Sequence, residues 1–101
     1  MSDSEHPRLS TDQARAKLTS LDTGWSLSDD GDAIERTIAC KGFAKAVYLA
    51  NLAAYHADRQ RHHPDIAFGM GYFRIGYTTH DVDGLSEKDF INAAAFDRLV
   101  G

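Results

Sequence analysis

The sequence predicts an α+β domain in which a four-stranded antiparallel sheet carries helices on one face, in the order α-β-β-α-β-β-α. Two pairs of short segments, near residues 25–40 and 66–79, have the β-branched and aromatic content of hairpin strands. Three other segments repeat apolar residues at helical spacing. Since the 101 residues are enough for one domain, the hairpins are expected to share one sheet.

The N-terminal segment, residues 1–8, is predicted to be a flexible tail that ends after Pro7, and residues 9–101 form the single domain. Ser10 is the expected N-cap of the first helix, because Gln13 follows at the spacing of a capping box. The sequence Asp22–Gly24 then ends this helix.

The first hairpin is expected to join residues 25–28 to residues 33–40 through the polar turn of residues 29–32. In the second of these strands Ile34 and Ile38 fall on one face and alternate with polar residues.

The longest helix is predicted from Phe43 to about Arg61, ending at or just before His62 and His63, because Pro64 cannot continue a helix. Its small-residue stripe is typical of close packing on a sheet. The residues assigned to this stripe are Phe43, Ala46, Val47, Ala50, Ala53, Ala54 and Ala57.

The second hairpin is expected to pair residues 66–68 with residues 72–79 around a glycine turn, with Phe73, Ile75 and Tyr77 on one face. The loop at residues 80–84 follows. Ser86 then caps the last helix, with Asp89 at the capping-box position.

The composition excludes several function classes. The net charge is −4 and no cluster of Lys and Arg stands out, which argues against nucleic acid as the main ligand. The single cysteine, Cys40, permits no internal disulfide. No apolar signal segment and no stretch of about 20 apolar residues is present, so we expect a cytoplasmic protein. Self-association is expected because so small a domain buries a modest fraction of its surface.

The histidine pair is the main candidate for chemistry. Asn51, Tyr55, Asp58 and His62 are spaced 4, 3 and 4 apart and share one helical stripe. Asp58 is therefore expected beside His62, where a carboxylate can hold an imidazole in one tautomer. His63 leaves the helix, and His80 ends the longest strand, so three imidazoles can converge on one cleft.

Plainer interpretations of these residues stay open. His62 and His63 can simply favour the negative end of the helix dipole, and Asp58 can form an ordinary surface pair. A zinc site built from the histidines and Asp58 has enough ligands. However, His56 and His62 lie six residues apart and do not share a helical face, so no metal is expected. Trp25 and Asp89 also have structural interpretations, as a core residue and as a helix cap.

The spacing Asp58-x3-His62-His63-Pro64, followed by His80 and then Asp89, resembles that of the pterin-4a-carbinolamine dehydratases. The resemblance extends from about Leu9 to Leu99. It is carried by the motifs GW, ERTIACKGFAKA, HHPDI, TTHD and GLSEKDF. Where the family pattern expects an aromatic residue after this proline, the chain has Met70, which implies altered affinity or packing.

The resemblance implies an α+β fold that forms dimers and tetramers, and an enzyme that dehydrates 4a-hydroxytetrahydropterin without a metal or organic cofactor. Residues implied for catalysis are His62, His63, His80 and Asp58, and residues implied for substrate binding are Thr78, Asp89 and Trp25. The implied partner pathway is that of a pterin-dependent aromatic amino acid hydroxylase. The alternative is a non-catalytic family member that binds or assembles other proteins, and the retention of all three histidines favours catalysis.

Overall fold

The computed structural model describes residues 6–22 and 24–101 and has the predicted order of elements. Residues 1–5 of the expected tail, and Thr23 in the expected turn, lie outside the described residues. The elements are α1 (Thr11–Leu18), β1 (Trp25–Leu27), β2 (Ile34–Ala39), α2 (Phe43–Gln60), β3 (Asp65–Gly69), β4 (Tyr72–Tyr77) and α3 (Glu87–Val100).

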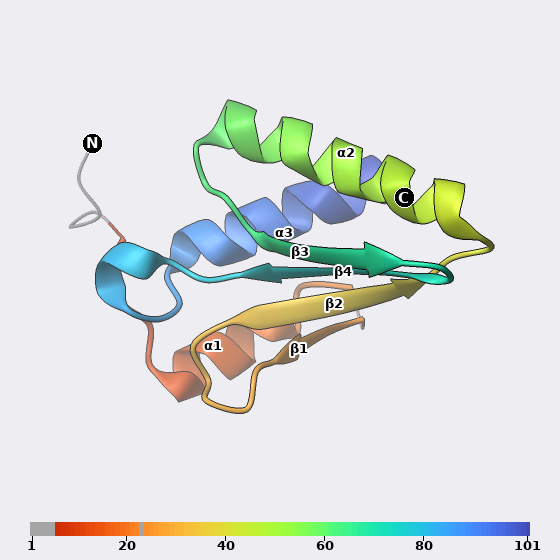
Figure 1. Cartoon of the computed structure of the whole chain (residues 1–101). Coiled ribbons are helices and arrows are strands. Elements are labelled where there is room, and N and C mark those ends of the chain that lie inside the picture. The colour runs from red at the N-terminus through yellow and green to blue at the C-terminus, as the bar shows by residue number, and fades with distance from the viewer. Residues whose placement is uncertain (1–5, 23) are drawn as a thin grey trace.

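The four strands form one antiparallel sheet with the order β1-β2-β4-β3. Both predicted hairpins are present, and the pairing of β2 with β4 joins them at the centre of the sheet (Figure 1). This arrangement brings the start of β3 and the end of β4 to the same end of the sheet, because Asp65 is paired with Gly76.

One face of the sheet carries the core, as the alternation in β4 predicts. Phe73, Ile75 and Tyr77 are each 0% exposed, and Ile34 lies opposite Tyr77 on β2. All three helices supply buried residues to this cluster, among them Ala14 from α1, Leu49, Ala50 and Ala53 from α2, and Phe90, Ala93 and Phe96 from α3. The prediction that the helices cover one face is therefore confirmed.

Both predicted capping boxes are confirmed. The Ser10 hydroxyl accepts from the backbone of Gln13, whose side chain bonds back to Ser10. At the start of α3, the backbone N–H of Ser86 donates to the Asp89 carboxylate at 2.9 Å. The second box also fixes the Asp89 side chain where α3 begins.

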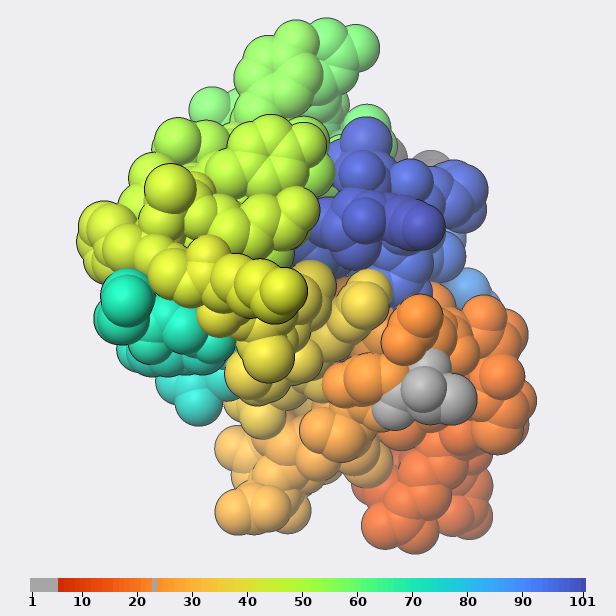
Figure 2. All heavy atoms as spheres, turned by 90° about the vertical axis from the view of Figure 1, so that its right-hand side faces the viewer, coloured from red at the N-terminus to blue at the C-terminus, as the bar shows by residue number. Residues whose placement is uncertain are grey.

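The buried face of α2 differs from the predicted stripe. Phe43 is 53% exposed and Ala54 is exposed, whereas Leu49 and His56 are buried together with the other alanines. Small residues occur on two neighbouring sides of this helix, so their size alone does not tell which side meets the sheet. Phe43 instead packs its ring 6.0 Å from that of Phe68, where the start of α2 lies beside the β3–β4 turn (Figure 2).

The burial of His56 predicts a dependence of stability on pH. Burial lowers the pKa of His56 below its ordinary value of 6.5, Arg98 acts in the same direction, and the Asn92 side chain partly offsets both. Below pH 6.5 the unfolded chain therefore binds a proton here that the folded chain does not, so stability falls until the lower folded-state pKa is reached. We expect His56→Gln to lose less stability than the wild type between about pH 7 and about pH 5. Urea unfolding across this range measures the difference, and identical pH slopes would contradict the prediction.

The segment after α2 turns sharply. Arg61 adopts a left-handed conformation with φ 55°, and the backbone N–H of His62 bonds to the carbonyl of Ala57 at 3.3 Å. The helix thus ends before the histidine pair, as predicted. Across the sheet, β4 ends at Tyr77 rather than Thr79, because Thr79 pairs with Gly84 and closes the loop that contains a 3-10 turn at His80–Val82.

Within residues 6–22 and 24–101, no helix combines the length and the apolar character that crossing a membrane requires.

Candidate active site

A pocket of about 330 Å³ lies where the end of α2, the end of β4 and the first turn of α3 meet. His62, His63 and His80 all line it, as does Thr78. Lys88, from α3, completes its wall. The structure therefore brings together the three histidines, although residues 62–63 and residue 80 lie far apart in the sequence.

His62 is the most buried of the three imidazoles, with a side chain that is 8% exposed. Its Nε2 lies 2.6 Å from Oδ1 of Asp89, whose side chain is 0% exposed. A short contact of this kind is typical of a charge-assisted hydrogen bond. With Nε2–H donating to the carboxylate, Nδ1 is the nitrogen available to a molecule in the pocket.

The Asp89 carboxylate is held on both of its oxygens. Oδ2 accepts the Thr79 hydroxyl at 2.8 Å and the backbone N–H of Ser86 at 2.9 Å, while Oδ1 accepts His62. The Thr79 and Ser86 hydroxyls also bond to each other at 2.7 Å. Because every member of this network is buried, it fixes the position of the carboxylate that orients His62.

Asp58 does not lie beside His62, which corrects the prediction from helical spacing. The i to i+4 rule requires the helix to continue through residue 62, but α2 ends at Gln60 and Arg61 redirects the chain. Asp58 Oδ1 instead accepts from Nε2 of His63 at 3.3 Å, and both side chains are largely exposed. So exposed a pair contributes little to stability.

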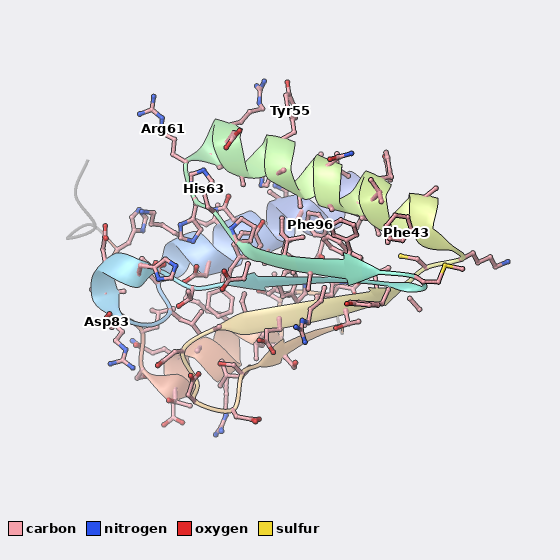
Figure 3. The ribbon with its side chains drawn as sticks, viewed as in Figure 1. Phe43, Tyr55, Arg61, His63, Asp83 and Phe96 are labelled. Atoms are coloured by element: carbon pink, nitrogen blue, oxygen red, sulfur yellow. The ribbon has the colours of Figure 1, made fainter. Side chains whose placement is uncertain are left out.

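The exposed residues of the site lie at its rim. Figure 3 shows His63 close to the start of β3, whereas Arg61 points away from the body of the molecule. His80 is exposed and begins the 3-10 turn His80–Val82, which Asp83 follows. The Thr78 hydroxyl donates to the Asp32 carbonyl at 2.6 Å, which ties the rim to the β1–β2 loop.

Trp25 does not line the pocket. It is 6% exposed, and its indole Nε1–H donates to the Asp97 carboxylate, 2.9 Å from Oδ1. Its ring packs 6.0 Å from that of Tyr77, which in turn lies 5.9 Å from His62 with the two planes 4° apart. Tyr77 therefore separates Trp25 from the histidine.

Four residues of the site region were not among the predicted site residues: Tyr77, Thr79, Ser86 and Lys88. Alternation along β4 places Tyr77 on the helix-covered face, which was a usable signal for its burial. Burial raises the pKa of the Tyr77 hydroxyl far above its ordinary value, and the charges of Asp89 and Asp97 act in the same direction. Tyr77 therefore remains a neutral phenol.

Met70, which departs from the family pattern, is 76% exposed in the turn after β3. The pocket contacts the opposite end of that strand, at Asp65. The departure therefore changes the surface of the hairpin turn and leaves the lining of the pocket as it is.

No group of three or more His, Cys, Asp or Glu side chains is arranged to hold a metal ion within the part of the chain that the structure describes.

The fold and the pocket together define a small α+β protein with a histidine-lined pocket at one end of an antiparallel sheet. The family model described as pterin 4 alpha carbinolamine dehydratase matches residues 7–99. The chain therefore belongs to the pterin-4a-carbinolamine dehydratase family.

Similar proteins agree with this placement. The chain is 46% identical over 95 residues to a protein of Paracoccus denitrificans named "Putative pterin-4-alpha-carbinolamine dehydratase", covering 94% of this chain and 88% of that one. A protein of Nitrosomonas europaea with the same name is 39% identical over 93 residues, covering 92% and 80%. The crystal structure of a "transcriptional coactivator/pterin dehydratase" from Brucella melitensis matches with a TM-score of 0.84 at 29% identity, covering 93% of this chain and 99% of that one.

Proposed function

We propose that this protein dehydrates 4a-hydroxytetrahydropterin to quinonoid dihydropterin and water by histidine acid–base catalysis. The observation that carries the proposal is the convergence of His62, His63 and His80 on one pocket of about 330 Å³. A pocket of this volume, at the lower end of the range for small-molecule sites, suits a flat bicyclic ring.

The reaction needs two proton transfers and no electron transfer. The bond between C4a and its hydroxyl oxygen breaks, and a general acid protonates the oxygen, because hydroxide is a poor leaving group. A base removes a proton from a ring nitrogen, whose electron pair forms the new double bond. Imidazoles exchange protons near neutral pH and serve either role.

We assign His62 as the principal acid. The Asp89 carboxylate stabilises a positive charge on this ring and leaves Nδ1 as the nitrogen that meets the substrate. His80 lines the same pocket from the β4 side and is the acid–base counterpart, while His63 and Thr78 contact the substrate. Asp58 acts only through His63, at the rim.

The proposed setting is the recycling of tetrahydropterin, with the substrate supplied by a pterin-dependent aromatic hydroxylase. The working form is proposed to be a homodimer or homotetramer in the cytoplasm, with no metal or organic cofactor in the reaction.

The direct test generates the 4a-hydroxypterin in situ with a hydroxylase and follows its decay by absorbance. We expect the wild type to accelerate this decay and His62→Ala to lower kcat by about 10²–10⁴-fold, the usual contribution of a well-placed acid. Gln60→Ala, an exposed change in the last turn of α2, is the matched control and should keep full activity.

The fold of each variant is checked by circular dichroism and thermal melting. A folded His62→Ala protein with wild-type kcat would contradict the assignment of the acid. A wild-type protein that does not exceed the spontaneous rate would instead favour the alternative, a family member that binds or assembles other proteins.

A further inference from the structure

Three aromatic rings from distant parts of the chain form a buried row behind the pocket. Trp25 of β1 packs against Tyr77 of β4, with ring centroids 6.0 Å apart. Tyr77 stacks on His62 at 5.9 Å, with only 4° between the planes. The three residues are 6%, 0% and 7% exposed, so the row is closed to solvent except where His62 reaches the pocket.

The hydrogen bond to Asp89 alone does not fix the direction of the His62 ring. A bond through Nε2 fixes one point of the ring, but it leaves rotation about the Nε2···Oδ1 axis free. That rotation would turn Nδ1 away from the pocket. A flat partner parallel to the ring restricts the rotation, and an offset stack at this centroid distance is favourable in itself.

Tyr77 supplies this flat partner and is itself immobilised. It lies opposite Ile34 in the β2–β4 ladder, and Trp25 packs against it. Trp25 in turn is anchored through Nε1 to both carboxylate oxygens of Asp97, at 2.9 and 3.0 Å. The Tyr77 hydroxyl is buried and has no hydrogen-bond partner within the described part of the chain, so the ring, and not the hydroxyl, makes the contact with His62.

We infer that Tyr77 is a positioning residue. Its stacked ring fixes the plane of the His62 imidazole, while the hydrogen bond to Asp89 fixes the position of Nε2. Trp25 supports the stack from behind and does not touch the substrate. The kinetic consequence rests on the proposed function, whereas the orientation of the ring does not.

The test compares Tyr77→Leu, which removes the ring, with Tyr77→Phe, which keeps it. The reporter is the low-field NMR resonance of the His62 Nε2 proton that is shared with Asp89, since its exchange with water depends on how firmly the ring is held. We expect this resonance to broaden or vanish in Tyr77→Leu and to persist in Tyr77→Phe. In the dehydration assay kcat should fall by about 10–100-fold in Tyr77→Leu with KM little changed, because small misplacements of a reacting group have effects of this size.

Phe73→Leu is the matched control. Phe73 is equally buried on the same face of β4, but it stacks on Phe96 rather than on a residue of the pocket. It should lower the melting temperature as Tyr77→Leu does, yet leave the resonance and kcat unchanged. If Tyr77→Leu does not fold, Tyr77→Met takes its place with the same expectation.

A resonance as sharp in the folded Tyr77→Leu or Tyr77→Met protein as in the Phe73→Leu protein would overturn the inference, as would failure of Tyr77→Phe to preserve it. This readout needs no substrate, so it stands even if the wild type lacks dehydratase activity. A wild-type protein without activity but with the expected resonances would refute only the proposed function.

Discussion

Asp89→Asn is expected to lower kcat for dehydration by about 10²–10⁴-fold while the protein stays folded. The carboxylate is the charged partner of His62 at 2.6 Å and is 0% exposed, so no water can replace it. An amide of the same shape cannot stabilise a protonated imidazole. The NH₂ group of the asparagine would also face donors that now bond to the carboxylate. Because two donors repel each other, the His62 ring would turn or be displaced. The rate of 4a-hydroxypterin decay at saturating substrate measures the effect.

The same substitution is expected to destabilise the fold by about 1–3 kcal/mol, because a buried donor from Thr79 or Ser86 loses its acceptor. Urea unfolding measures this loss. Glu87→Gln is the matched control, since Glu87 lies in the same first turn of α3 but pairs with Lys17 at the surface. Wild-type kcat in a folded Asp89→Asn protein would show that the Asp89 charge takes no part in catalysis.

The fold could be predicted because its signals are local. Capping boxes at Ser10 and Ser86, the alternation of Phe73, Ile75 and Tyr77, and the break at Pro64 each act within a few residues of the chain. Such signals give the type and order of the elements. They do not give the side of a helix that meets the sheet, and for this reason Phe43 and Ala54 were wrongly placed on the buried face of α2.

The candidate site was predicted only in part, because its main contacts are not local. The three histidines could be chosen as candidates from the sequence, because an imidazole exchanges protons near neutral pH wherever it lies. The partner of His62 was misjudged, because Asp58 is near in sequence whereas Asp89 is 27 residues away and comes from another helix. Only the pairing of β3 with β4, which brings Thr79 and the start of α3 to the histidine pair, decides between the two carboxylates.

A second non-local network lies behind the pocket and joins β1, β2 and α3. Asp97 of α3 forms an ion pair with Arg36 of β2, and the side chains are 17% and 16% exposed. The same carboxylate accepts from Trp25 and from the backbone N–H of Asp22. Arg36 also occupies the helix-covered face of the sheet, opposite Ile75, where the alternation of β2 predicts an apolar residue. Asp97 therefore satisfies a cation that the core would otherwise exclude.

Asp97→Ala is accordingly expected to destabilise the protein by about 2–4 kcal/mol, because it leaves Arg36 largely buried without its partner and removes the acceptor of Trp25. Arg36→Met with Asp97→Leu should recover much of this loss, since apolar residues of similar size often replace a buried pair without penalty. Urea unfolding of Arg36→Met, of Asp97→Leu and of the double variant that combines them gives the coupling energy. If the losses of unfolding free energy in the two single variants simply add up in the double variant, Arg36 and Asp97 act separately. The position of Arg36 on the core face would then have another cause.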